Sequence, residues 1–308
     1  MKEIELHVHS FGLRFRLRHH PGFDVFRFLE VAAGLGFTGV NISANGPGYR
    51  DLGGTSPEHF ASVRAKLEEL GLRAEVDTSG TDPDHLGELL GVAKAVGADQ
   101  LRTYTRHLGT RDVIIERTAA DLLKVIPAVE ETGINVLLEN HEDLRGSAIA
   151  EILSRIDHGR IRALFDYGNS EMVGEDPWAA LEAMAPYTRA VHLKDHVLVR
   201  HKGTIRVQGV VLGSGRLPVL AMTDRLYQTG LRRFCFENVW GYTAAIQVDE
   251  GDLPTTAPFE LDDGNSFLDA GGLGPSEAVE WEWVAFEQSW EWLQNTLTEA
   301  GYRWGSAS

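Results

Sequence analysis

The stretch EETGINVLLE, residues 130–139, contains a helix end, a glycine turn and the start of a β-strand. Gly133 stands at the turn because glycine adopts the left-handed backbone conformation of a helix C-terminus without strain. The residues that follow it are mostly apolar and favour a strand. The same pattern returns in three other stretches: AAGLGFTGVNI (32–42), KLEELGLRAEV (66–76) and AKAVGADQLRTY (93–104). The chain is therefore predicted to repeat a unit of helix, turn and strand.

Eight strand-like segments are spread along the chain, with amphipathic helix-like segments between them. The predicted strands are 4–9, 37–42, 72–76, 100–104, 135–139, 162–166, 190–193 and 233–237. Eight such repeats close naturally into a (β/α)8 TIM barrel, which commonly forms one domain of about 250 residues or more. We therefore predict a single TIM-barrel domain over residues 1–308. The alternative is an open doubly wound sheet, but no G-x-G-x-x-G motif follows the first predicted strand.

The segment 241–275 interrupts this repeat between the eighth predicted strand and the last helix-like run. It contains several Asp and Glu residues and no Lys or Arg. A loop of this length inside a compact domain is commonly functional. Three interpretations stay open: a solvated acidic insertion, a lid over a site, or an arm that binds a partner.

The composition favours a protein of the cytoplasm. The formal net charge of −16 opposes binding to phosphate backbones, so no nucleic-acid partner is expected. One cysteine, Cys235, excludes an internal disulfide and fits a reducing compartment. No apolar run is long enough to span a bilayer, and MKEIELHVHS lacks the opening of a signal peptide. We therefore expect no membrane association.

Four consecutive predicted strands end in, or nearly in, a residue that can bind a metal. These residues are Glu139, Asp166, His192 and Glu237. Barrel enzymes place their chemistry at the C-terminal ends of their strands, so the four side chains are expected to meet. Three carboxylates at one place repel one another unless a cation lies between them. Oxygen ligands with one imidazole suit Mn²⁺, Mg²⁺ or Co²⁺, and we predict Mn²⁺ first.

The segments VLLENHED, LFDYGNS, AVHLKD and FCFEN, in this order, resemble the four metal-ligand strands of the xylose-isomerase-like TIM barrels. Those proteins are sugar isomerases and epimerases. The resemblance implies that the four residues above hold the metal, and that a sugar or keto-sugar loses a proton next to its carbonyl. Endonuclease IV shares this plan, but it needs more histidine ligands and a basic groove, which the net charge of −16 disfavours.

The proton-transfer group has several candidates. Glu139 and His141 are two residues apart and so share one side of a strand, which makes His141 a candidate base or substrate contact. Capping of the next helix is its structural alternative. In tagatose-type epimerases the two ligand glutamates act as acid and base, so Glu139 and Glu237 are competing candidates. Asn169 departs from that subgroup, because those enzymes usually carry histidine three residues past the ligand that corresponds to Asp166.

Four further residues are expected to contact the substrate: Arg102, Asn169, Lys194 and Trp240. Arg102 suits an anionic group, and Lys194 suits a substrate hydroxyl or a metal-bound water. Trp240 suits stacking on a sugar ring or an aromatic aglycone. The structural alternatives are a strand-end arginine, a surface salt bridge and core packing, respectively.

Two other functions stay open. The Glu139–His141 pair is similar to that of the C-glycoside deglycosidase α subunits, which eliminate an aromatic aglycone from a 3-keto sugar and work with a small β subunit. The segment 241–275 could contact such a subunit or aglycone. The other function is a barrel that binds sugar without catalysis. In each case the expected partner is a small sugar or glycoside, and an oligomer is expected.

Overall fold

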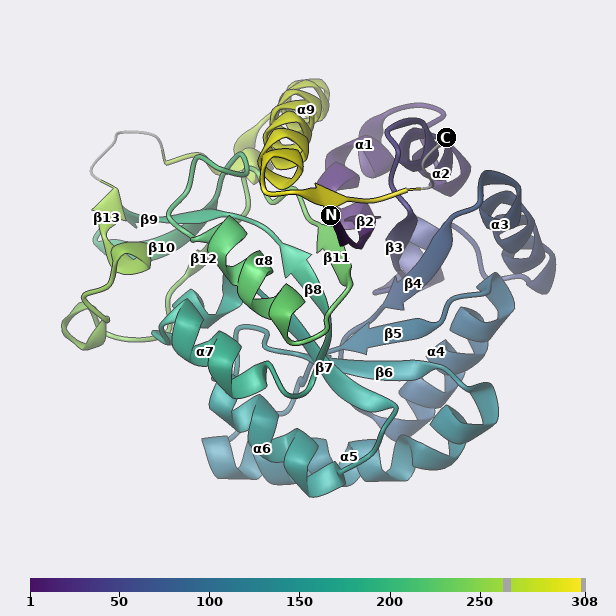
Figure 1. Cartoon of the computed structure of the whole chain (residues 1–308), viewed down its shortest axis with the longest axis horizontal. Helices are drawn as coiled ribbons and strands as arrows, with labels where there is room; N and C mark the ends of the chain where they lie inside the picture. Colours follow the sequence, from purple (N-terminus) through teal and green to yellow (C-terminus); the bar gives the residue numbers. More distant parts are fainter. Residues whose placement is uncertain (263–266, 306–308) are drawn as a thin grey trace.

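The computed structural model describes residues 1–262 and 267–305 and contains a closed barrel of eight parallel strands with helices around it (Figure 1). The barrel strands are β2 (Glu5–His9), β3 (Gly39–Ser43), β4 (Arg73–Asp77), β5 (Gln100–Thr103), β6 (Asn135–Glu139), β7 (Ile161–Asp166), β8 (Thr188–Leu193) and β11 (Arg233–Phe236). The barrel closes between β11 and β2, where Cys235 pairs with His7. The predicted TIM barrel is confirmed, and no strand end differs from its predicted position by more than two residues.

The helices between these strands cover the outside of the barrel (Figure 1). They are α2 (Val25–Gly34), α3 (Pro57–Leu70), α4 (Pro83–Val96), α5 (Arg111–Thr132), α6 (Gly146–Ile156), α7 (Pro177–Met184) and α8 (Val219–Gln228). Gly71, Gly97 and Gly133 each follow a helix with φ of 66°, 80° and 72°, so the glycine turns of the sequence are helix C-termini.

The elements at the two ends of the chain pack against each other on the outside of the barrel. The helix α1 (Arg14–His19) packs on the long α9 (Pro275–Glu299), and β1 (Lys2–Glu3) pairs with β14 (Tyr302–Arg303). Glu282 of α9 accepts the backbone N–H groups of Phe15 and Arg16, each at 2.9 Å. This buried carboxylate therefore satisfies amides of the first turn of α1.

Among the described residues, no helix combines the length and the apolar character that crossing a membrane requires.

A hairpin that the sequence analysis did not predict follows β8. Its strands β9 (His196–His201) and β10 (Thr204–Gly209) are joined by Lys202 and Gly203, which have φ of 50° and 78°. Two residues with positive φ form the turn that suits a tight hairpin. The alternating apolar residues of HVLVRH and TIRVQG around Lys-Gly are the sequence signal that could have predicted these strands.

The segment 241–275, expected as a loop, extends this hairpin into a sheet at the side of the barrel (Figure 1). The strands β12 (Thr243–Ala245) and β13 (Leu261–Asp262) give the sheet order β12-β10-β9-β13. Short 3₁₀ turns lie at Glu250–Asp252, Ala257–Phe259 and Ala270–Gly272, and residues 263–266 lie outside the described residues. The other 3₁₀ turns among the described residues are Ser10–Leu13, Pro47–Leu52 and Asn169–Val173.

Alternate side chains of each barrel strand point into the barrel, because neighbouring residues of a strand face opposite sides. The middle of the barrel is closed by a layer that includes Leu137, Leu164 and Cys235, all fully buried. In the same layer the Nδ1 atom of His7 lies 2.8 Å from a Glu75 carboxylate oxygen. Gly39 makes room for His7, since a Cβ atom there would lie 2.4 Å from the imidazole. This layer separates the two mouths of the barrel.

Candidate functional site

The four predicted ligands come together at the C-terminal mouth of the barrel. Glu139 and Asp166 are the last residues of β6 and β7, and Glu237 directly follows β11. His192 of β8 pairs with Asp166 on one side and with Cys235 on the other, which places it between the two acidic strand ends. All four side chains are buried.

The imidazole of His192 is the centre of the group. Its Nδ1 atom lies 3.6 Å from Glu139 Oε1, 3.7 Å from Asp166 Oδ2 and 3.8 Å from Glu237 Oε2. These distances are too long for a hydrogen bond but leave room for an ion between the groups. Glu139, Asp166 and His192 have ligand atoms within 4.8 Å of one another, and so have His9, His192 and Glu237.

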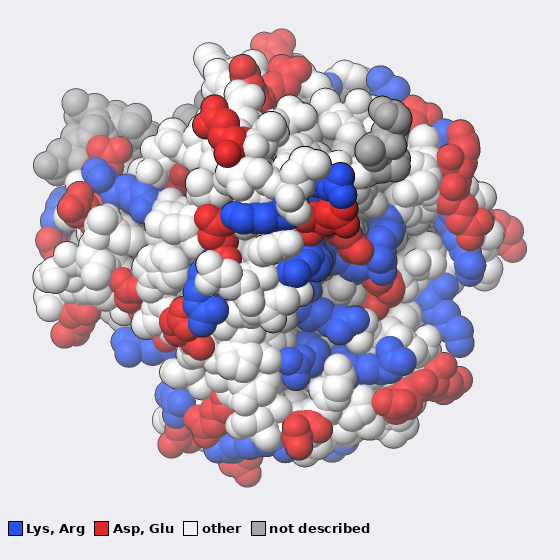
Figure 2. Space-filling model, in the orientation of Figure 1, with Lys and Arg blue, Asp and Glu red and all other residues white. Residues whose placement is uncertain are grey.

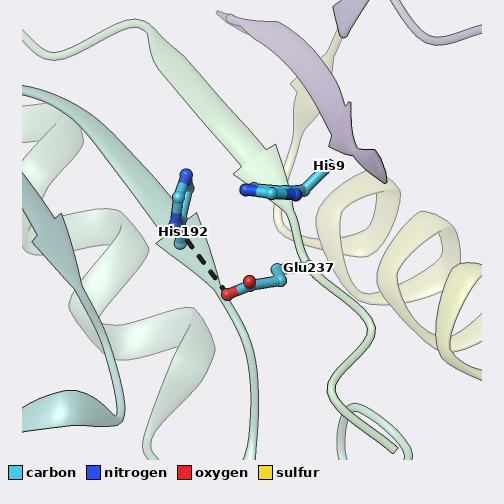
Figure 3. A group of neighbouring side chains, drawn as sticks. All are labelled: His9, His192 and Glu237. Carbon is cyan, nitrogen blue, oxygen red and sulfur yellow. Dashed lines mark ion pairs between the residues drawn. The ribbon is translucent and has the colours of Figure 1, made fainter. Parts of the chain in front are cut away.

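His9 is a member of this group that the predicted ligand set did not include. Figure 3 shows the side chains of His9 of β2, His192 of β8 and Glu237, just after β11, pointing toward one another. The rings of His9 and His192 are 4.9 Å apart and nearly perpendicular. His9 Nε2 lies 2.7 Å from Asp77 Oδ2, and His9 Nδ1 accepts the Phe11 N–H. The two-residue spacing of His7 and His9 was the only sequence signal for an inward histidine.

The charged side chains that line the cavity leave a net negative charge that one divalent cation would balance. Five carboxylates line the cavity, and so do three cationic side chains, Arg50, Arg102 and Lys194. The difference of two negative charges equals the charge of one divalent ion. The buried atoms His192 Nδ1 and Glu237 Oε2 also lack a hydrogen-bond partner among the described residues. The group of Glu139, Asp166 and His192 has two carboxylates and one imidazole, and the group of His9, His192 and Glu237 has one carboxylate and two imidazoles. Such donor sets fit a divalent metal, so these residues could hold one.

His192 would release a proton when a metal binds. Burial lowers its pKa, but its contacts with Asp166, Glu139 and Glu237 raise it more, to about 10. Its Nε2 atom lies 3.3 Å from the Asn41 amide nitrogen, while Asn41 Oδ1 has no partner among the described residues. With the Asn41 amide rotated, Oδ1 accepts a hydrogen bond from the Nε2–H group of His192, which leaves Nδ1 free for a metal.

Lys194 lies directly beside the predicted ligands. Its Nζ atom is 2.7 Å from Asp166 Oδ2 and 3.6 Å from Glu237 Oε2, and it donates to Asn169 Oδ1 at 2.8 Å. Burial raises the pKa of Asp166, but the Lys194 charge and the His192 contact lower it well below its usual range. Asn169, where the epimerase subgroup has histidine, thus orients the ammonium group of Lys194.

Arg102 holds Glu139. Its Nε atom lies 3.1 Å from Glu139 Oε2, and a second guanidinium nitrogen lies 3.4 Å from Oε1. A third contact goes to the Thr78 carbonyl oxygen at 3.3 Å. Arg102 also lines the cavity, so its contact with an anionic substrate group stays a prediction beside its pairing with Glu139.

His141 lines the cavity as a neutral imidazole. Burial and the positive charges of Arg102 and Lys194 lower its pKa well below the usual value. Its ring stacks on Tyr104 with 3.7 Å between centroids and an angle of 6° between the planes. This stacking fixes the ring at the wall of the cavity, where its free nitrogen is available as a proton acceptor or hydrogen-bond partner.

Trp240 does not line the cavity, whereas its neighbour Tyr242 does. Trp240 packs in a separate apolar cluster with Phe15, and its carbonyl oxygen accepts from Arg14 at 2.8 Å. Tyr242 reaches across the mouth of the cavity and donates its hydroxyl to Glu142. The cavity beneath has a volume of about 140 Å³. The segment after β11 therefore contributes a roof through Tyr242.

A family model described as the xylose isomerase-like TIM barrel matches residues 29–255, well over half of the chain. The chain therefore belongs to this family.

Individual relatives are more distant. The chain is 27% identical to the uncharacterized protein YihM of Escherichia coli (strain K12), over 74% of this chain and 69% of that protein. It is 28% identical to the 3-oxo-isoapionate decarboxylase of Pectobacterium atrosepticum, over 59% of this chain and 65% of the enzyme. The solved D-psicose 3-epimerase of Clostridium cellulolyticum H10 with D-tagatose has a TM-score of 0.64 and 13% identity, covering 93% of this chain and 98% of the epimerase. At that identity the likeness shows the fold alone.

Proposed function

We propose that this protein is a divalent-metal-dependent enzyme that removes a proton next to the carbonyl of a small sugar or keto-sugar, as isomerases and epimerases do. The observation that carries the proposal is the convergence of Glu139, Asp166 and Glu237 on His192 Nδ1 within 3.6 to 3.8 Å in a buried cavity. Mn²⁺ is the first candidate ion, followed by Mg²⁺ and Co²⁺, because oxygen ligands predominate.

The ion, when bound, supplies Lewis acidity that acidifies the carbon next to a carbonyl. The protein adds a fixed positive charge, because the ammonium group of Lys194 lies on the cavity wall and is held by Asn169. Such a charge stabilises the negative oxygen of an enediolate when the substrate loses its proton. Burial lowers the pKa of Lys194, but Asp166, Glu237 and Glu139 raise it above the usual value, so the group stays charged at neutral pH.

Glu237 is the proton-transfer group that the contacts favour. Glu139 is held through both carboxylate oxygens by Arg102, and its side chain is 0% exposed. Glu237 has no hydrogen bond to Oε2 among the described residues, and its side chain is 8% exposed, so it reaches the cavity surface. His141 is the second proton-transfer candidate, on the wall where it stacks on Tyr104. An epimerase needs one such group on each face of the substrate.

The cavity favours a small substrate. Its volume of about 140 Å³ lies below the roughly 300 to 1,000 Å³ of ligand pockets that enclose drug-sized molecules. The aromatic aglycone of a C-glycoside would need the contact between Tyr242 and Glu142 to open, and Trp240 lies outside the cavity. Elimination from a 3-keto C-glycoside, with a small β subunit, is therefore the less favoured alternative.

Decarboxylation of a keto-sugar acid is a second candidate, favoured by the likeness to 3-oxo-isoapionate decarboxylase. Loss of carbon dioxide next to a carbonyl leaves the same kind of enolate, which Lys194 would stabilise together with a bound cation. This reaction needs no proton abstraction at its first step. The Glu237→Gln variant should therefore lose epimerisation by at least about a hundredfold while retaining more of any decarboxylation.

The test is deuterium uptake. Wild-type protein with Mn²⁺ is incubated with a panel of free ketoses in deuterated water, and exchange next to the carbonyl is followed by NMR. We expect exchange that EDTA abolishes, that Glu237→Gln loses, and that the exposed-site control Glu151→Gln retains. Cleavage of a 3-keto C-glycoside with no exchange in any ketose supports the deglycosidase instead. Sugar binding that is independent of metal and leads to no reaction supports a non-catalytic barrel.

A further inference from the structure

A second cavity lies at the opposite mouth of the barrel, at the N-terminal ends of the strands. Its volume is about 660 Å³, and it is lined by the first residues of several strands, including Glu5, Gln100 and Thr188. Arg162 of this cavity and Asp166 of the candidate metal site lie four residues apart on β7, or roughly 13 Å along the strand. The buried layer with Leu137, Leu164 and Cys235 closes the barrel between them.

Six arginines line this basal cavity: Arg73, Arg162, Arg189, Arg225, Arg232 and Arg233. Figure 2 views this face and shows Lys and Arg gathered near its centre. Only three acidic residues line the same cavity: Glu5, Asp99 and Glu182. The cavity therefore has an excess of three positive charges in a chain whose formal net charge is −16.

Half of these arginines are neutralised by the cavity's own acids. Arg225 makes two contacts of 2.7 Å with the Glu182 carboxylate. Arg233 contacts Glu5 at 2.9 Å and Asp99 at 2.7 and 2.9 Å. The remaining paired arginine, Arg73, contacts Glu5 at 2.8 Å and Asp99 at 2.5 Å.

The other three, Arg162, Arg189 and Arg232, have no carboxylate within ion-pair distance among the residues that the structure describes. Arg162 donates to the Pro186 carbonyl oxygen at 2.6 Å. Arg232 donates to the carbonyl oxygens of Tyr227 and Leu231, and its guanidinium lies 3.9 Å from the centre of the Tyr227 ring. These contacts orient two of the guanidinium groups and leave N–H groups of each without a partner in the structure.

We propose that the basal cavity binds a small anion that carries two or more linked phosphate groups, either inorganic pyrophosphate or the diphosphate of a nucleotide. The planar guanidinium fork matches phosphate oxygens in pairs. The three unpaired charges match the roughly three negative charges of a diphosphate at neutral pH. A nucleic acid is a poor ligand because the strong negative charge of the whole chain repels it. This site is independent of the proposed function.

The test is calorimetric titration of the full-length protein with pyrophosphate and, separately, with ADP, without added divalent metal. Arg189→Gln is the main variant, because the Arg189 side chain has no ion pair or hydrogen bond with any of the residues that the structure describes. We expect binding by the wild-type protein and at least about tenfold weaker binding by Arg189→Gln, since one charge-assisted contact is lost. A double variant, Arg162→Gln with Arg189→Gln, should weaken binding further.

Two controls make the result specific. Arg64→Gln removes an equal charge from the exposed surface of α3, where Arg64 pairs with Glu68, and should leave affinity unchanged. Asp166→Asn changes the candidate metal site and should also leave it unchanged. The proposal is overturned by an absence of binding at millimolar ligand, by equal losses in Arg64→Gln and Arg189→Gln, or by citrate binding as tightly as pyrophosphate.

Discussion

Replacing Lys194 by methionine removes a buried cation and keeps the length of the side chain. In the metal-free protein this leaves Asp166, whose carboxylate lies 2.7 Å from the ammonium group, without its closest opposite charge. Removing one partner of a buried ion pair costs about 3 to 5 kcal/mol. Since His192 keeps a proton through its raised pKa of about 10, we expect the lower end, about 3 kcal/mol. For a chain of 308 residues that corresponds to a fall in Tm of roughly 5 °C.

Mn²⁺ should raise the Tm of the Lys194→Met variant by more than it raises the Tm of the wild-type protein. A divalent ion restores the positive charge that Lys194 supplied, and any ligand that binds only the folded state raises Tm. The assay is thermal unfolding followed by circular dichroism, first in EDTA and then with saturating Mn²⁺. Lys66→Met is the control, because Lys66 pairs with Glu30 and Glu69 at the surface, where such pairs contribute about 1 kcal/mol or less.

A double variant separates the ion pair from simple loss of packing. Lys194→Met with Asp166→Asn removes both charges, so its loss of stability should be smaller than the sum of the two single losses. The role of Lys194 as the counter-charge of Asp166 is refuted if Lys194→Met in EDTA melts within a degree or two of the wild-type protein. It is refuted equally if Mn²⁺ raises the Tm of the two proteins by the same amount.

Three further predictions concern other contacts. Tyr242→Ala opens the roof over the 140 Å³ cavity, so kcat/KM for a larger ketose should rise relative to a smaller one, while Tyr242→Phe leaves the ratio near that of the wild type. Asn169→Leu removes the acceptor that orients Lys194 and should lower kcat more than about tenfold; a normal kcat would exclude that positioning role. Burial raises the pKa of Glu282 from 4.5 to about 7, against the opposing effects of Arg14 and two backbone N–H groups. The raised pKa therefore adds up to about 3 kcal/mol to the free energy of unfolding below pH 4.5, and this contribution is lost as the pH rises through 7. The difference in the free energy of unfolding between the wild-type protein and Glu282→Gln should change across this pH range.

The barrel was predictable from the sequence because each glycine turn and strand is a local pattern. The convergence of Glu139, Asp166, His192 and Glu237 was predictable for a related reason: parallel strands in one barrel bring their C-terminal ends to the same mouth. These predictions needed no knowledge of side-chain contacts. The position of a residue within its strand was sufficient.

Residues beyond the strand ends were less predictable, because a turn ends the alternation of side chains. Gly241, with φ of 73°, follows Trp240 and redirects the chain, so Trp240 packs outward and Tyr242 faces the cavity. Long-range partners were equally hidden. The sequence does not indicate that Arg102 contacts Glu139, or that His9 approaches His192.

Titration with Mn²⁺ tests the central proposal most directly. The wild-type protein is cleared of metal with EDTA, dialysed, and titrated calorimetrically beside Asp166→Asn and His192→Gln, with circular dichroism to show that each variant is folded. We predict one Mn²⁺ per wild-type chain and affinity at least about a hundredfold lower in both variants, as loss of a ligand implies. A wild-type chain that takes up no divalent ion, or folded variants that bind as tightly as the wild type, would contradict the proposed site.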